Sequence, residues 1–202
     1  MSKSQSFEIV GNPKIKHKKR NNAFKIASVG IGLSPLEGEE QINLLVDFIK
    51  LLVKNGLDVI VKPHPNNRSQ IADIVGLNEV KVLQGDISTT TFFSQIDVIC
   101  VERSQIGTDS LFAGIPIIVL DLGFSDLQNG ILLNKNASVP IVGNTNELIL
   151  ELNKLKLERE YFERRLTNQF KFYDEMFEYV DSEVEPIYHD KLNSLLGIKI
   201  TD

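Results

Sequence analysis

The segment Asp97–Leu120, DVICVERSQIGTDSLFAGIPIIVL, contains a complete strand–helix–strand unit. Its two ends, Asp97–Val101 and Pro116–Leu120, are short apolar runs rich in β-branched residues, which is typical of strands buried on both faces of a parallel sheet. The stretch between them, Ser104–Ala113, is expected to be a helix that ends at Gly114. Two strands joined through a helix lie parallel in one sheet, so this unit predicts an α/β fold.

The same alternation continues on both sides of this unit. We expect further strands at Phe24–Gly32, Leu57–Val61, Val80–Leu83 and Val139–Val142, and further helices after Ser34, near Ser69–Val75, at Thr89–Gln95 and at Thr145–Leu157 with Asn144 or Thr145 as its cap. One strand follows another about every 20 to 25 residues, as in successive βαβ units. The predicted architecture is a doubly wound, mostly parallel, Rossmann-like sheet with helices on both faces.

The first helix has recognisable signals at both ends. Ser34, Pro35 and Glu37 form the pattern of an N-cap, a first-turn proline and a capping box. Asn55-Gly56 predicts the end of the same helix. We therefore expect this helix to begin at Pro35.

The composition is ordinary for a globular protein of 202 residues, with 42% hydrophobic and 24% charged residues. The net charge of −5 does not indicate a nucleic-acid partner. Cys100 is the only cysteine, which excludes an intrachain disulfide, and its place inside an apolar run predicts a buried core residue. No apolar run is long enough to span a membrane and the first residues lack a signal-peptide pattern, which favours a cytoplasmic protein.

Changes in composition divide the chain into three parts. We expect residues 1–23 to be a basic tail or linker, residues 24–157 the Rossmann-like nucleotide-binding domain, and residues 158–202 a C-terminal helical extension. The basic run Lys14–Arg20 is either solvated linker or a contact for anionic lipid or a polyanionic acceptor, which would place the protein at the cytoplasmic face of a membrane.

Distinctive polar residues follow the predicted strand Leu57–Val61. Lys62-Pro63-His64-Pro65 presents a cation and an imidazole on a turn stiffened by two prolines, which suits a phosphate or a leaving-group oxygen. The alternative is a structural loop in which His64 caps a helix. Both interpretations stay open from these residues alone.

Hydroxyl groups gather at the start of the helix that follows Asp97–Val101. The segment Ser104–Ser110 contains Ser104, Thr108 and Ser110, and the free N–H groups and dipole of a helix start bind anions. The alternative is that Ser104 is only an N-cap and that Gly107 allows close packing against the sheet.

Other residues narrow the choice of function. Gly30 and Gly32 leave room for a ligand beside the first strand, but they do not form the G-x-G-x-x-G pattern of a dinucleotide-binding dehydrogenase, and no P-loop pattern is present. Asp121, after the strand Pro116–Leu120, would either meet a ribose or base or cap the next turn. The three histidines show no metal-ligand spacing, so we expect neither a metal nor a cofactor.

Taken together, KPHP at Lys62–Pro65 and S-x-x-G-T-D-S-L-x-x-G-I-P at Ser104–Pro116 resemble the nucleotide-binding C-terminal domain of GT-B glycosyltransferases. The pattern is most similar to bacterial polysaccharide and capsule enzymes with an HP and a serine motif: polysialyltransferases, Kdo transferases and CDP-glycerol glycerophosphotransferases. UDP-N-acetylglucosamine 2-epimerases share the fold and a similar segment. Val10–Pro13 is similar to the V-G-N-P that precedes the second domain in such proteins, so the resemblance extends from Val10 to Leu157.

The resemblance implies a site for a nucleotide-activated sugar or polyol donor, which is a substrate and not a cofactor. It makes His64 the catalytic residue, binding the donor phosphate or assisting departure of the nucleotide. It assigns nucleotide and phosphate binding to Lys62, His64, Ser104, Gly107, Thr108, Asp109 and Ser110, with Asp109 standing where many GT-B proteins carry a ribose-binding Glu. The implied reaction is metal-free transfer with inversion in surface polysaccharide synthesis.

A GT-B enzyme has two such domains, and the N-terminal one usually supplies the base and the acceptor site. The resemblance therefore implies a missing N-terminal domain or a partner subunit. Aromatic residues in the C-terminal extension would either pack toward that domain or complete the core of this one: Tyr161, Phe162, Phe170, Tyr173 and Phe177. Two other functions remain open, a nucleotide-sugar epimerase or hydrolase and a non-catalytic nucleotide-binding or assembly module.

Overall fold

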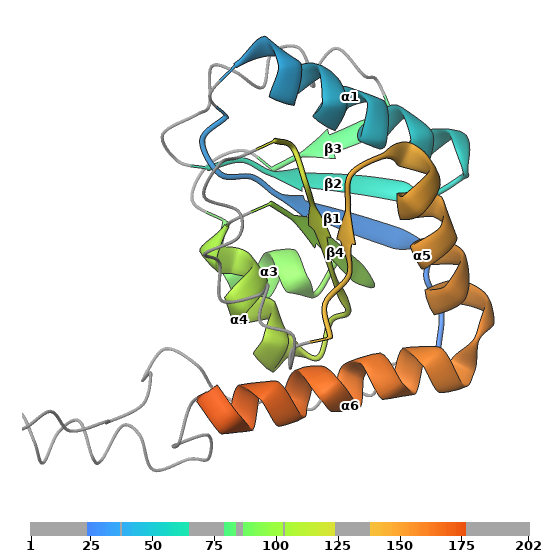
Figure 1. The fold of residues 1–202 in the computed structure, drawn as a ribbon. Helices are drawn as coiled ribbons and strands as arrows, with labels where there is room; N and C mark the ends of the chain where they lie inside the picture. The colour runs from blue at the N-terminus through green and yellow to red at the C-terminus, as the bar shows by residue number, and fades with distance from the viewer. Residues whose placement is uncertain are drawn as a thin grey trace, which may run out of the picture.

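Six strands, all of them parallel, form one sheet at the centre of the structure, a computed structural model (Figure 1). The structure describes residues 24–36, 38–64, 79–83, 87–102, 104–123 and 138–176. The strands are β1 (Ser28–Gly32), β2 (Asp58–Lys62), β3 (Val80–Val82), β4 (Val98–Val101), β5 (Ile117–Leu120) and β6 (Ile141–Val142). Their order, β3-β2-β1-β4-β5-β6, is that of a doubly wound Rossmann-like sheet. The predicted fold class is confirmed.

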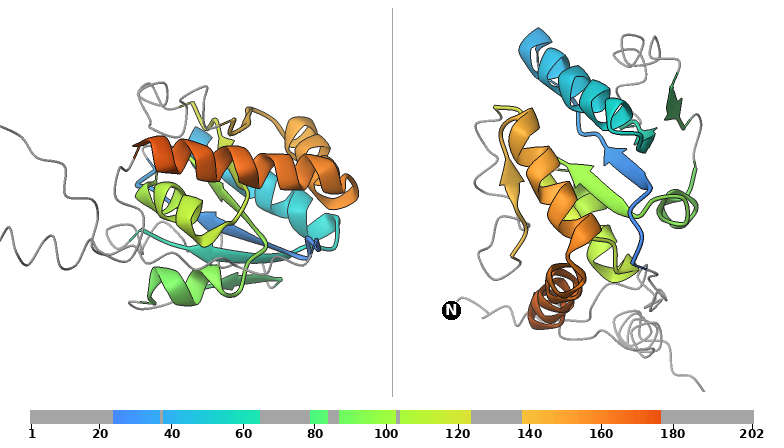
Figure 2. Two further views of the ribbon diagram at one scale, coloured as in Figure 1. Left: turned by 90° about the horizontal axis from the view of Figure 1, so that it is seen from below. Right: turned by 90° about the vertical axis from the view of Figure 1, so that its right-hand side faces the viewer.

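Helices cover both faces of this sheet. They are α1 (Glu39–Lys54), α3 (Thr89–Phe93), α4 (Gln105–Ala113), α5 (Thr145–Leu157) and α6 (Arg159–Met176). Helices α1 and α5 pack beside each other on one face, and α3 and α4 pack beside each other on the opposite face (Figures 1 and 2). Helix α6 contacts both α4 and α5, so it connects the two helical layers.

Strand β1 lies between β2 and β4, and its two glycines let helices approach it closely. A Cβ on Gly30 would lie 2.5 Å from Ile96 Cδ1 and 2.7 Å from Phe92 Cζ, and a Cβ on Gly32 would overlap Ile106 Cγ2. The prediction that these glycines leave room for a ligand is therefore wrong, because apolar side chains already fill that space.

At its amino end, β1 is fixed to the segment before β4 by a carboxylate. Asp97 Oδ2 accepts hydrogen bonds from the N–H groups of Ala27 and Ser28 and from Ser28 Oγ, each at 2.9 Å. Bonds to a charged acceptor are stronger than those between neutral groups. This contact fixes the register in which Val29 lies opposite Val98.

The start of α1 differs from the prediction. The helix begins at Glu39 with Gly38 as N-cap, four residues after the expected first residue Pro35. A tertiary contact acts on this segment: the Ser34 N–H donates to Glu102 Oε1 at 2.7 Å, which holds Ser34 at the edge of the sheet. The carboxylate of Glu39 lies in the first turn, where the helix dipole favours it.

The other boundaries follow local signals. Helix α1 ends at Asn55 with Gly56 at φ +71°, and α4 ends at Gly114 with φ +63°, as expected. Asn144 is the cap of α5 and accepts a hydrogen bond from the Glu147 N–H at 3.0 Å. The helix expected near Ser69–Val75 lies outside the described residues.

Two side chains of α6 satisfy backbone groups at and just before the start of β5 that no strand in the described ranges covers. Strand β6 pairs only with Val119 and Leu120. At the start of β5 and just before it, Gln169 Nε2 donates to Ile115 O at 3.0 Å, Gln169 Oε1 accepts from Ile117 N at 3.1 Å, and Arg165 Nη2 donates to Ile117 O at 2.6 Å. The Gln169 amide therefore replaces one peptide unit of a neighbouring strand, because it presents a donor and an acceptor side by side.

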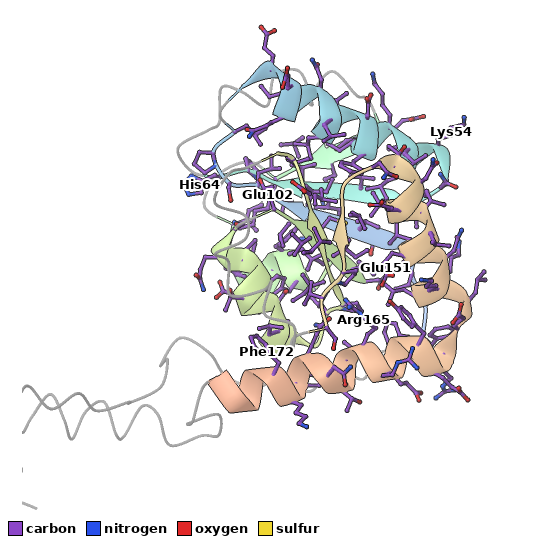
Figure 3. All side chains as sticks on the ribbon, in the orientation of Figure 1. Lys54, His64, Glu102, Glu151, Arg165 and Phe172 are labelled. Atoms are coloured by element: carbon purple, nitrogen blue, oxygen red, sulfur yellow. The ribbon has the colours of Figure 1, made fainter. Side chains whose placement is uncertain are left out.

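The polar network continues to α5. Glu151 is buried, and its Oε1 lies 4.0 Å from Arg165 Nε and accepts a 2.5 Å hydrogen bond from the Tyr161 hydroxyl (Figure 3). Burial, together with the bond to Glu151, raises the pKa of Tyr161 to about 12, and burial lowers the pKa of Arg165. A buried cation is tolerated here because a carboxylate and a carbonyl face it.

The aromatic residues of α6 mainly serve this domain. Phe162 is buried in the core and meets Phe24 edge-on, with 5.6 Å between ring centroids. Phe172, which the sequence pattern did not single out, is also buried, whereas Tyr161 and Phe170 are half-buried. The side chain of Tyr173 and the whole of Phe177 lie outside the described residues.

Replacing Gln169 with Ala should lower the free energy of unfolding by about 2–4 kcal/mol, because the buried backbone groups Ile115 O and Ile117 N lose their partner. Asn168→Ala is the matched control, since that neighbouring amide donates only an exposed 3.2 Å hydrogen bond to Ser138 Oγ. Urea unfolding with an unchanged m-value would measure the difference. Equal stability of the two variants would contradict this account.

Candidate functional site

The carboxyl ends of all six parallel strands lie at one edge of the sheet. The segments after β2, β4 and β5 therefore share that edge, as predicted. Strands β1 and β4 are neighbours, and the helices that follow them, α1 and α4, cover opposite faces. Ligands of doubly wound folds bind at this switch point. Figure 3 shows His64 and Glu102 at this edge of the sheet.

The segment after β2 brings a cation and an imidazole to the switch-point edge. Lys62 is the last residue of β2 and lies opposite Gly32 in the register. Its Nζ donates to Ile87 O at 2.7 Å, which connects β2 to the residues just before α3. His64 is half-buried two residues further on, and Pro65 lies outside the described residues.

The start of α4 presents the predicted hydroxyls at different depths. Ser104 is the N-cap, with φ −72° and ψ 136°, and its side chain makes no capping hydrogen bond. The Gly107 N–H donates to Ser104 O at 2.9 Å. Thr108 and Ser110 are buried, and Ser110 Oγ donates to Gly107 O at 2.6 Å inside the helix. Asp109 is half-buried in the second turn. Ser104 is thus the predicted hydroxyl nearest the helix start.

Two consecutive N–H groups of the loop after β1 connect these two segments. The Leu33 N–H donates to Lys62 O at 3.1 Å, and the Ser34 N–H donates to Glu102 Oε1 at 2.7 Å. Neighbouring strands lie about 4.8 Å apart, so β2 and β4, with β1 between them, end about 10 Å from each other. The loop therefore joins the His64 segment to the residues that lead into Ser104.

Glu102 is a site residue that the sequence analysis did not identify. It directly follows β4 and is only 2% exposed. The available signal was a charged residue immediately after an apolar strand, which is the same signal that identified Lys62 after β2.

Asp121, at the end of β5, caps a turn. Its Oδ1 accepts a hydrogen bond from the Gly123 N–H at 2.9 Å, and Gly123 has φ +81°. Of the two roles considered for Asp121, the structure shows the capping role.

The described residues also bear on thiol reactivity, metal binding and membrane insertion. Burial raises the pKa of the Cys100 thiol to about 12, so the thiol stays protonated at neutral pH within β4. Within the described ranges, no group of three or more His, Cys, Asp or Glu side chains is placed to hold a metal ion. No helix in the described part of the chain is both long and apolar enough to cross a membrane.

Many solved structures resemble this fold, among them the following three. The wall teichoic acid polymerase TagF with CDPG matches with a TM-score of 0.58 and 16% identity, over 87% of this chain and 44% of that one. The C-terminal CMP-Kdo binding domain of WaaA from Acinetobacter baumannii matches with a TM-score of 0.54 and 16% identity, over 74% of this chain and 90% of that one. A putative UDP-N-acetylglucosamine 2-epimerase from Listeria monocytogenes matches with a TM-score of 0.55 and 14% identity, over 81% of this chain and 48% of that one. No protein-family model matches the chain, and no curated protein matches it in sequence.

These likenesses and the strand order define a Rossmann-like domain with the fold of one half of a GT-B protein. The chain spans less than half of TagF and of the Listeria protein, and nearly all of the isolated WaaA domain. The predicted Rossmann-like fold of a single GT-B half is thereby confirmed.

Replacing Gly32 with Ala should destabilise the domain by about 1–3 kcal/mol, because the added Cβ would overlap Ile106 and push α4 away from β1. Gly38→Ala is the control, since a Cβ there meets no atom within 4 Å. The double variant with Ile106→Ala should be less destabilised than the sum of the single variants. Strict additivity in urea unfolding would refute the close contact.

Proposed function

We propose that this chain is the donor-binding half of a glycosyltransferase or glycerophosphotransferase that uses a nucleotide-activated sugar or polyol in surface polysaccharide synthesis. The observation that carries the proposal lies at the switch point: the Leu33 and Ser34 N–H groups bond to Lys62 O and to Glu102 Oε1, so one loop joins the His64 segment to the residue that follows β4. The fold supports it, because nucleotides bind at this position in doubly wound sheets.

In this proposal the donor phosphates lie at the start of α4. Ser104 donates its hydroxyl there, and the N–H groups around Gly107 and Thr108 supply the partial positive charge of the helix end. Lys62 adds a positive charge from the end of β2 while one of its protons stays on Ile87 O. Asp109, one turn into the helix, would bind the ribose. Ser110, whose hydroxyl donates within the helix, would contribute through the shape of that turn.

His64 would act at the bond that breaks. In a glycosyl transfer, the acceptor hydroxyl attacks the donor carbon, and the electron pair of the carbon–oxygen bond moves to the phosphate oxygen. In a glycerophosphate transfer, the hydroxyl attacks the phosphorus that carries the glycerol, and the electron pair of the phosphorus–oxygen bond moves to the oxygen of the departing nucleotide. A proton or hydrogen bond from the imidazole stabilises that developing charge. The proton of the acceptor hydroxyl passes to a base on the second domain, so this chain supplies only the leaving-group half of the reaction.

The likeness to the Listeria protein favours a second candidate, an epimerase or hydrolase of nucleotide sugars. A non-catalytic nucleotide-binding or assembly module is a third. Cytoplasmic location and contact of Lys14–Arg20 with anionic lipid or a polyanionic acceptor belong to the same proposal, and those residues lie outside the described ranges.

Replacing His64 with Ala should weaken nucleotide binding by about 1–3 kcal/mol without unfolding the domain, because one charge-assisted hydrogen bond to the phosphates is lost. A thermal-shift panel of CMP, CDP, UDP and GDP selects the nucleotide, and calorimetry then compares affinities. Lys54→Ala, which removes a positive charge from the end of α1, is the control. Equal affinity of wild type and His64→Ala would show that the phosphate role is wrong.

The chain alone should bind the donor yet fail to catalyse multi-turnover transfer. A single domain forms one wall of the site and cannot exclude water or orient an acceptor hydroxyl. The assay uses labelled nucleotide sugars or CDP-glycerol with a polysaccharide acceptor, and it monitors epimerised and hydrolysed products as well. Robust transfer by the isolated monomer would contradict the two-part mechanism, and epimerisation would favour the second candidate.

A further inference from the structure

Glu102 is a carboxylate buried at the switch point. It lies between the last residue of β4 and the N-cap of α4, and its side chain is 2% exposed. Taking a carboxylate out of water costs several kcal/mol unless strong hydrogen bonds compensate. The 2.7 Å bond from the Ser34 N–H is such a bond, so the carboxylate and the loop after β1 stabilise each other's position.

The bond between the Ser34 N–H and Glu102 lies next to the contact between the loop and β2, so it can position the loop as well as stabilise the fold. Ser34 is 5% exposed, and the preceding N–H of Leu33 donates to the carbonyl of Lys62. A loop anchored on one side only could still leave the end of β4 or the end of β2. Glu102 supplies the anchor on the β4 side, and it does so two residues before Ser104.

We propose that Glu102 is a positioning residue for the nucleotide site: its carboxylate oxygen holds the loop Leu33–Leu36 between the His64 segment and the start of α4. The effect on nucleotide affinity rests on the proposed function, whereas the hold on the loop does not. Glu102 touches the Ser34 N–H and acts on the nucleotide through that loop.

The negative charge of Glu102 and its hydrogen bond to the Ser34 N–H predict opposite effects of a Glu102 substitution on nucleotide affinity. A buried negative charge beside a phosphate site repels the phosphates, so removing the charge alone would strengthen nucleotide binding. Removing the hydrogen-bond acceptor would instead release the loop and weaken binding, because only molecules with the loop in place are competent. Two uncharged side chains of similar size separate these effects: Gln keeps an oxygen acceptor, and Met does not.

The test compares wild type, Glu102→Gln and Glu102→Met. Calorimetry uses the nucleotide selected from CMP, CDP, UDP and GDP. Glu102→Gln should bind it at least as tightly as wild type, and Glu102→Met should bind it about tenfold more weakly, as expected if the loop is in place in about a tenth of the molecules.

Hydrogen exchange of the Ser34 amide, followed by NMR, should be faster in Glu102→Met than in Glu102→Gln. Glu147→Ala is the control, since Glu147 Oε2 also accepts a backbone N–H, that of Gly143 at 2.8 Å, beyond the end of β6.

Equal affinities of Glu102→Gln and Glu102→Met, or equal exchange of the Ser34 amide in both, would overturn the proposal. If wild type binds none of the four nucleotides, the proposed function fails while amide exchange still decides whether Glu102 holds the loop. Glu102→Met replaces a buried charge by an apolar group of similar volume, so we expect it to fold, and far-UV circular dichroism confirms this before binding is measured.

Discussion

The arrangement of the site depends on the missing side chains of Gly30 and Gly32 in β1. In a sheet covered on both faces, the Cβ atoms of the central strand normally set how near a helix can come. Here Ile106 of α4 occupies the space over Gly32, and Phe92 and Ile96 occupy that over Gly30. The first turn of α4 therefore lies directly over the end of β1. The hydrogen bond between the Ser34 N–H and Glu102 forms at the same place, since these residues follow the ends of the neighbouring strands β1 and β4.

Helix ends that are set by residues adjacent in sequence were predictable. Gly56 and Gly114 adopt positive φ at helix ends, and Asn144 caps α5, because these preferences arise within one turn of chain. The start of α1 was not predictable in this way. Ser34 has the chemistry of an N-cap, yet the helix uses Gly38, and the Ser34 N–H bonds to a carboxylate 68 residues away, a contact that no local pattern indicates.

In the candidate site, too, some features were predictable from nearby residues and others depend on tertiary contacts. The sequence pointed to Lys62, His64 and Ser104 because each follows or adjoins an apolar strand, and parallel topology then brings strand ends to one edge. It could not indicate that Lys62 bonds to Ile87 O, 25 residues away. That contact depends on a side-chain direction that only packing determines.

The way α6 meets β5 has a consequence for association between copies of the chain. An uncovered strand presents N–H and C=O groups on which another chain can pair, and such edges are a common origin of aggregation. Gln169 and Arg165 occupy those groups at Ile115 and Ile117, so they block strand addition with side chains instead of backbone. A chain without α6 would expose these backbone groups at Ile115 and Ile117, on which a strand of another chain could pair. Such a chain would aggregate and lose solubility before it lost secondary structure.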